Sequence, residues 1–148
     1  MTDIERLHAA VQLVIDKQGS ADEVSPASIA TEVMRAIEFP PELHELGYVG
    51  CHLEVRQIAR QKLRRQHDPN ARVAGSIAGE DELFPDTLQE RYPRRPRPNE
   101  DPVYAKRDAL TDEDVAYNVG RMRRGARALL KHADALEAWH VDRGSMAA

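Results

Sequence analysis

The sequence of 148 residues has one cysteine, few aromatic residues and no long apolar run. A single cysteine excludes an internal disulfide framework and a zinc site built from several cysteines. No apolar stretch approaches the roughly 20 residues that cross a bilayer, so no membrane span is expected. The first residues include the acids Asp3 and Glu5 rather than a basic stretch before an apolar core, so no secretory signal is expected. These absences predict a soluble, cytoplasmic protein of about one domain.

The apolar residues that are present recur mostly at helical spacing, which predicts an all-α fold. Alternating apolar patterns are short, so no strand is predicted. The N-terminal unit, residues 1–67, is expected to hold three helices, over about 2–18, 25–37 and 48–66. For the second of these helices, Ser25 is the predicted N-cap and Pro26 the first helical residue, where its missing N–H has no cost.

Residues 68–110 are predicted to form an extended connector, because glycines and prolines interrupt every long periodicity there. Its segment 94–98 alternates arginine with proline, which favours polyproline-like backbone. An apolar cluster inside the connector predicts a short docking motif that binds either the chain's own helices or another protein. The residues of this docking motif are Leu83, Phe84, Leu88 and Tyr92.

The last predicted element is a long helix over residues 111–142, followed by a disordered tail over 143–148. Thr111 is its N-cap, and the acids of its first turn complement the helix dipole. Apolar residues then recur at alternating spacings of four and three, which is a heptad seam. The seam consists of Val115, Val119, Met122, Ala126, Leu129, Ala133 and Leu136. Such a seam either packs on the N-terminal helices or pairs with another chain, so a coiled-coil homodimer is one hypothesis.

No catalytic constellation is visible in the sequence. The six histidines include no pair four residues apart, and neither a metal-ligand pattern nor a phosphate-binding glycine loop occurs. Cys51 and His52 are adjacent and would not face each other on a helix, so Cys51 is interpreted as a small buried packing residue. The sequence therefore predicts no enzyme activity, no cofactor, no metal and no small-molecule substrate.

The net charge of −4 conceals alternating blocks of charge. Such blocks either neutralise one another in the fold or attract a charged partner. Two basic helix faces are candidates for binding nucleic acid or another anionic partner, and their residues are Arg56, Arg60, Arg64, Arg65, Arg121, Arg124 and Arg127. Against this reading, the sequence pI is about 5.9, and the helices over 25–37 and 48–66 are joined by about ten residues where a helix-turn-helix has three or four.

Two stretches in the last 65 residues resemble uncharacterised small proteins from phage-derived regions of bacterial genomes. The first runs from Leu83 to Pro93, and the second runs from Leu110 to Val115 and continues from His132 to Trp139. This resemblance implies a mobile-element setting and transfers no functional site.

Together these features predict a non-enzymatic regulatory or protein-interaction protein that acts through helical surfaces. The alternative is a DNA-binding transcriptional or accessory regulator that uses its basic helix faces. The partner is expected to be another protein, a second copy of the chain, or nucleic acid.

Overall fold

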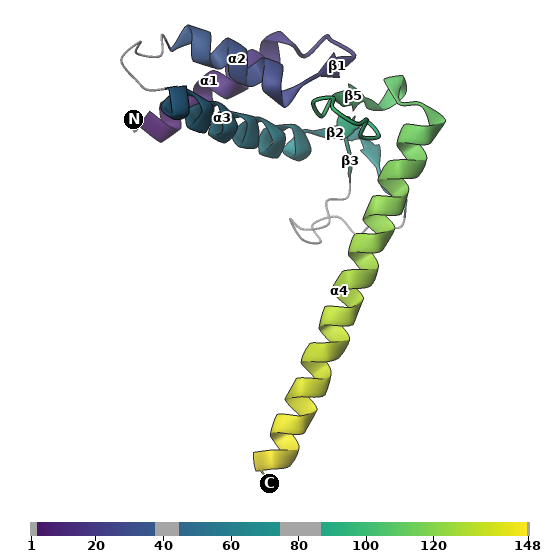
Figure 1. Cartoon of the computed structure of the whole chain (residues 1–148). Helices are drawn as coiled ribbons and strands as arrows, with labels where there is room; N and C mark the ends of the chain where they lie inside the picture. Colours follow the sequence, from purple (N-terminus) through teal and green to yellow (C-terminus); the bar gives the residue numbers. More distant parts are fainter. Residues whose placement is uncertain (1–2, 38–44, 75–86, 148) are drawn as a thin grey trace. The chain divides into compact units, whose positions relative to one another are not determined.

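The computed structural model describes residues 3–37, 45–74 and 87–147. The chain divides into two compact units, residues 1–110 and residues 111–148. Among these described residues, the first unit has the helices α1 to α3 and five short strands, and the second unit has the helix α4 (Figure 1). None of the described helices is both long enough and apolar enough to span a membrane.

The helices of the first unit are α1 (Asp3–Lys17), α2 (Pro26–Ala36) and α3 (Glu45–Arg65), close to the predicted ranges. Ser25 caps α2, as predicted, because its Oγ accepts hydrogen bonds from the backbone N–H groups of Ala27 at 3.2 Å and Ser28 at 3.4 Å. Residue 2, at which the first helix was predicted to begin, lies outside the described residues.

The hydrophobic core lies where α1, α2 and α3 pack on one another. Each helix contributes one apolar side, represented by Val11 of α1, Ile29 of α2 and Leu63 of α3, all with no exposed surface. Val24 and Tyr104 belong to the same cluster, although both lie on strands. The core is therefore shared between the helices and a sheet.

The prediction of an all-α fold is wrong, because the described residues contain two antiparallel sheets. In one, β1 (Glu23–Val24) and β4 (Arg91–Pro93) lie on either side of β5 (Tyr104–Lys106). In the other, β2 (His67–Arg72) pairs with β3 (Thr87–Gln89). Four of the five strands lie in the segment predicted to be an extended connector. Strands of two or three residues are too short to show the alternation by which a strand is recognised, and the six residues of β2 are mostly polar and include a proline.

Residues 94–103 connect β4 to β5 and are called the arginine loop below. The loop closes with a backbone hydrogen bond from the N–H of Arg94 to the carbonyl of Val103, at 2.9 Å. At its tip, Pro98 precedes Asn99, whose φ of 59° is the only positive φ among the described non-glycine residues. Proline followed by an asparagine with positive φ is typical of a type II turn. The proline-rich segment is thus a hairpin loop and not a free linker.

The second unit contains α4 (Asp112–Ala147), which extends beyond the predicted end at residue 142. Thr111 and Asp114 form a reciprocal cap. The Thr111 Oγ1 accepts from the Asp114 N–H at 3.2 Å, and the Asp114 Oδ2 accepts from the Thr111 N–H at 3.1 Å. Every side chain from Met122 to Met146 is exposed.

Candidate nucleic-acid interface

From Gln57 onward the exposed side of α3 is polar and carries arginines, whereas Leu53, one turn earlier, is an apolar residue that is 55% exposed. The buried side of α3 consists of Val55, Ile58, Ala59 and Leu63. Residues at the intervening positions point away from the core and form what we call the α3 outer face, made up of Gln57, Arg60, Gln61 and Arg64. The two glutamines were not singled out from the sequence, and only the position of the buried side reveals that they accompany the arginines.

Arg60 and Arg64 are the cations of the α3 outer face. Arg64 is exposed and Arg60 is partly exposed. Neither forms an ion pair or a side-chain hydrogen bond with any residue in the described part of the chain. Arginine and glutamine side chains are those that most often hydrogen-bond guanine and adenine edges in the major groove, and arginine also binds phosphate.

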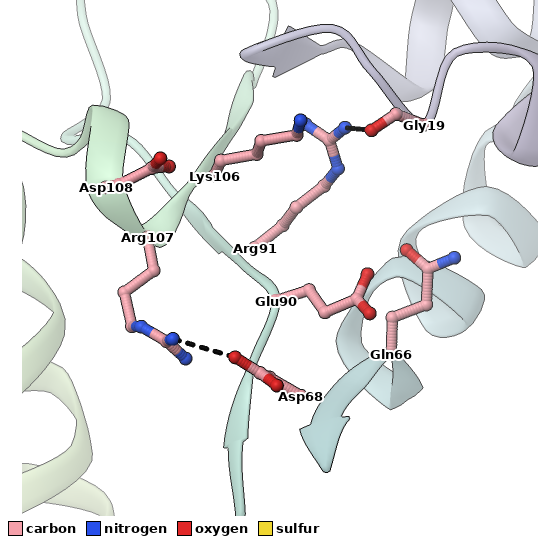
Figure 2. A pocket seen from close by; sticks show the side chains of 8 residues that line it. All are labelled: Gly19, Gln66, Asp68, Glu90, Arg91, Lys106, Arg107 and Asp108. Carbon is pink, nitrogen blue, oxygen red and sulfur yellow. Dashed lines mark hydrogen bonds and ion pairs between the residues drawn. The ribbon is translucent and has the colours of Figure 1, made fainter. Parts of the chain in front are cut away.

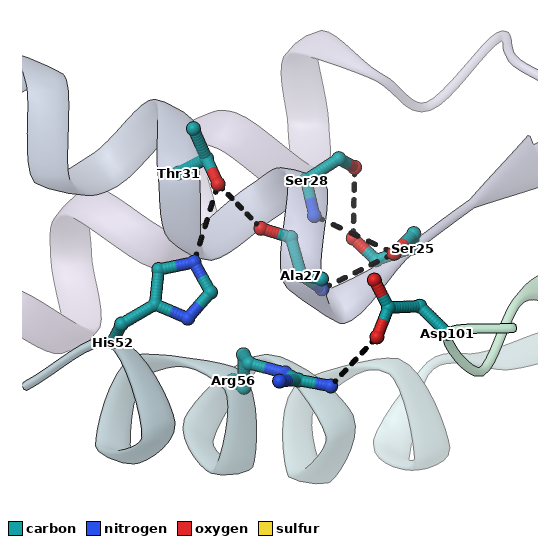
Figure 3. A network of polar contacts seen from close by, with 7 residues as sticks. All are labelled: Ser25, Ala27, Ser28, Thr31, His52, Arg56 and Asp101. Carbon is teal, nitrogen blue, oxygen red and sulfur yellow. Dashed lines mark hydrogen bonds and ion pairs between the residues drawn. The ribbon is translucent and has the colours of Figure 1, made fainter. Parts of the chain in front are cut away.

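Arg56 lies one turn before Arg60, at the edge of the α3 outer face, and fixes the arginine loop to the helix. Its Nη2 donates to the Oδ1 of Asp101 at 3.2 Å, with 21% of the Arg56 side chain exposed (Figure 3). One turn earlier, the Nε2 of His52 lies 3.2 Å from the Oγ1 of Thr31 in α2. Because the Thr31 hydroxyl donates to the Ala27 carbonyl at 3.0 Å, His52 is the donor to Thr31. Arg56 and His52 therefore hold α3 to its neighbours, and Arg56 is not available as a phosphate ligand.

The arginine loop uses some of its cations within the fold. Arg94 forms an ion pair with Glu23 of β1, and its Nη2 donates to the Ala109 carbonyl at 3.1 Å. Arg97 is exposed and, like Arg60 and Arg64, has no partner within the described ranges. Because Asp101 of the same loop is paired with Arg56, the loop is held to α3 near the α3 outer face.

The other arginines predicted for this interface lie elsewhere. Arg65 is exposed at the end of α3 and lines a pocket of about 210 Å³ with His8 and Gln12 of α1 and with Gln61 of the α3 outer face. The remaining three lie on α4, in the second unit, where Arg124 and Arg127 are exposed and Arg121 is partly exposed. Of the seven predicted arginines, Arg60 and Arg64 lie together on the α3 outer face.

A second polar cavity of the first unit, of about 500 Å³, is lined by both signs of charge (Figure 2). Its cations already have partners. Arg107 donates to the Oδ2 of Asp68 at 2.8 Å, and Lys106 donates to the Ser20 carbonyl at 3.2 Å. The hydrogen bonds from Arg107 and from the Asn70 N–H lower the pKa of Asp68. The cations of this cavity therefore stabilise contacts within the fold.

Arg91 is the most buried cation of the cavity wall, with 3% of its surface exposed. Its guanidinium donates to the carbonyls of Gln18, Gly19, Ala21 and Asp22, at 3.4, 3.2, 2.7 and 3.4 Å. These carbonyls end α1 and lead into β1. Burial lowers the pKa of the Arg91 guanidinium. Arg91 therefore fixes the connection between α1 and β1 and is a structural cation.

The predicted docking motif is not one surface in the described chain. Leu83 and Phe84 lie outside the described residues. Leu88, on β3, is 38% exposed, whereas Tyr92, on β4, is buried, and its hydroxyl accepts a hydrogen bond from the Gln89 N–H at 3.2 Å. Leu88 lies in the middle of the strand over residues 87–89, and Tyr92 lies in the middle of the strand over residues 91–93.

The interpretation of Cys51 as a buried packing residue is wrong, because Cys51 is exposed. It lies in the second turn of α3, whereas the buried side of this helix begins at Val55 among the residues whose burial is described. The part of α3 that packs in the core is thus shorter than its apolar pattern indicates.

No group of three or more histidine, cysteine, aspartate or glutamate side chains in the described ranges is arranged to hold a metal ion. Comparison of the chain with family models, with curated proteins and with solved structures finds no match. The α3 outer face and the arginine loop are therefore assessed by their chemistry alone.

Proposed function

We propose that this protein is a non-enzymatic regulator that binds duplex DNA through the α3 outer face and the arginine loop. The observation that supports this most directly is the lack of any protein partner, within the described residues, for Arg60, Arg64 and Arg97. An arginine without a carboxylate can neutralise a phosphate and release its counterion without first breaking an ion pair. The glutamines beside Arg60 and Arg64 add amide groups that can hydrogen-bond base edges.

This geometry differs from a standard helix-turn-helix. Eight residues separate the end of α2 at Ala36 from the start of α3 at Glu45, compared with three or four in that motif. The proposal therefore rests on the exposed arginine and glutamine side chains of α3 and on the hairpin loop that Arg56 and Asp101 hold beside this helix. DNA binding would place the protein in the bacterial cytoplasm, and the resemblance to phage-derived proteins suggests a mobile-element setting.

The test is fluorescence anisotropy of labelled duplex DNA, measured over a series of salt concentrations starting at about 50 mM. Each arginine that neutralises a phosphate contributes about −0.9 to the slope of log K against log salt. Replacing Arg60 and Arg64 with alanine should weaken binding and reduce the magnitude of the slope by about 1.8. Arg35→Ala is the matched control, because Arg35 is an exposed arginine on α2, away from the α3 outer face.

Two results would contradict the proposal. One is no binding of duplex DNA by the unmodified chain at the lowest salt concentration. The other is a double variant with the same affinity and slope as the Arg35 control, which would show that binding comes from a diffuse positive charge elsewhere.

A protein-interaction role is the second candidate function, and the exposed apolar residues of α4 favour it. Met122, Leu129, Leu136 and Trp139 are each more than half exposed. Exposed apolar stripes of this kind are typical of protein-binding surfaces. Capture of a different protein by α4, in preference to a second copy of the chain, would support this role.

A further inference from the structure

The apolar stripe along α4 has no role in the proposed DNA binding. This helix has 36 residues and is therefore about 54 Å long. The larger seam residues are exposed over 46–64% of their surface, and they are Val115, Met122, Leu129 and Leu136. Between them the seam positions hold the smaller residues Val119, Ala126 and Ala133. A partner surface should therefore present small residues to the large ones and large residues to the small ones.

We propose that α4 pairs with α4 of a second copy of this chain as an antiparallel two-helix coiled coil. In one register, Ala126 faces Leu136 of the second copy and Ala133 faces its Leu129. Each alanine then receives a leucine, and the two-fold symmetry repeats both pairs. The dyad passes near Lys131, close to the middle of the helix, so nearly the whole length of α4 is paired.

The positions that flank the seam agree with this register. Gly125 comes to lie beside Trp139 of the second copy, which is 54% exposed in the single chain. A Cβ atom at residue 125 would meet nothing within 4 Å, so nothing in the described chain requires glycine there. Glycine inside a helix is unfavourable relative to alanine, and the space it provides for a large ring explains its presence.

Charge complementarity selects the antiparallel orientation. In this arrangement Arg123 lies beside Glu137 of the second copy, and the symmetry forms this ion pair twice. A parallel pair in register would instead set the basic segment 121–131, with five cations, alongside its own copy. It would also place Ala126 against Ala126 of the second copy, which leaves unfilled space between the two helices at the alanine positions of the seam.

The first experiment measures the mass of the full chain by light scattering and sedimentation. The unmodified chain should be a dimer at about 50 μM. Gly125→Leu should improve the helix propensity of α4 and nevertheless weaken the dimer by at least tenfold, because the leucine occupies the space for Trp139. The matched control is Gly120→Leu, since residue 120 points away from the paired surface and a Cβ there would meet only the mobile end of Arg124, at 3.5 Å.

The second experiment tests orientation by disulfide formation in a Cys51→Ser background. Leu130→Cys lies next to the dyad of the antiparallel pair and should cross-link to itself, whereas Ala126→Cys should not. The reverse result would establish a parallel pair and overturn the proposal. A monomeric wild-type chain, or a Gly125→Leu variant that dimerises as well as the Gly120→Leu control, would also overturn it. None of these measurements depends on DNA binding, so the two proposals can fail separately.

Discussion

Replacement of Arg91 offers a direct test of how the first unit is held together. Its guanidinium makes four hydrogen bonds to backbone carbonyls, of which the two shortest, to Ala21 and Gly19, measure 2.7 and 3.2 Å. A hydrogen bond to a charged group is worth about 1.5–3 kcal/mol, so these two contribute about 3–6 kcal/mol before other effects. Arg91→Met removes both bonds and keeps most of the side-chain volume.

Two effects make the expected loss of stability smaller than the contribution of these two hydrogen bonds. The variant no longer has to desolvate a cation, whose burial lowers the pKa of Arg91. Water can also reach part of the connection that the guanidinium binds, because residues 19–22 are exposed. We therefore expect Arg91→Met to lower the free energy of unfolding by about 2–4 kcal/mol, a large part of the roughly 5–15 kcal/mol that stabilises a typical domain. Arg91→Lys keeps the charge and loses the forked geometry, so its effect should be intermediate.

The assay is urea denaturation of the full chain followed by circular dichroism. Exchange of the buried amides of α2 should be measured in parallel, because α4 contributes to the dichroism and lies in the other unit. With an m value of about 2 kcal/mol per molar urea, in the middle of the usual range, the midpoint for Arg91→Met should fall by about 1–2 M. A loss below about 1 kcal/mol, or a lysine variant as stable as the unmodified chain, would refute the structural role assigned to Arg91.

Two further predictions concern local stability. Ser25→Ala removes the acceptor for the first N–H groups of α2 and should cost about 1 kcal/mol in the same urea assay, whereas Ser25→Asp should restore most of it. The pKa of Asp68 is lowered by its hydrogen bonds from Arg107 and the Asn70 N–H, so the ionised carboxylate stabilises the fold above the pKa of unfolded aspartate and this contribution is lost as the pH falls through the lower folded value. Asp68→Asn should therefore show a smaller loss of stability between about pH 4 and pH 2 than the unmodified chain, and equal acid profiles would contradict this assignment.

The helices could be predicted because their signals are local. Ser25 and Pro26 begin α2, and Thr111 begins α4, through contacts within one turn of the chain. The buried side of α3, at Val55 and Leu63, lies within the helix that apolar spacing predicted over 48–66. Cap residues and side-chain periodicity act over a few residues, so a single sequence contains most of the information that they provide.

The strands could not be predicted because their partners are distant in the sequence. Glu23 pairs with Ala105, and β1 has only two residues. A strand of this length is stabilised by its neighbours and by the core contact of Val24, not by its own pattern. The burial of Tyr92 could not be predicted for the same reason. Tyr92 was assigned to a docking motif by its apolar side chain, and only the pairing of β4 with β5 shows that it is buried in the fold.

The partners of the charged residues in the alternating blocks could not be predicted from the sequence, for a different reason. The sequence left two possibilities, mutual neutralisation or attraction of a partner, and the answer differs from one arginine to the next. Arg56 is paired with Asp101, and Arg107 with Asp68, so in both pairs the carboxylate comes from a segment far away in the sequence. Partly exposed ion pairs of this kind add little stability, and their main effect is to position the segments that they join. The cations available to an anionic partner are those left over, and the α3 outer face retains Arg60 and Arg64 because no carboxylate among the described residues pairs with them.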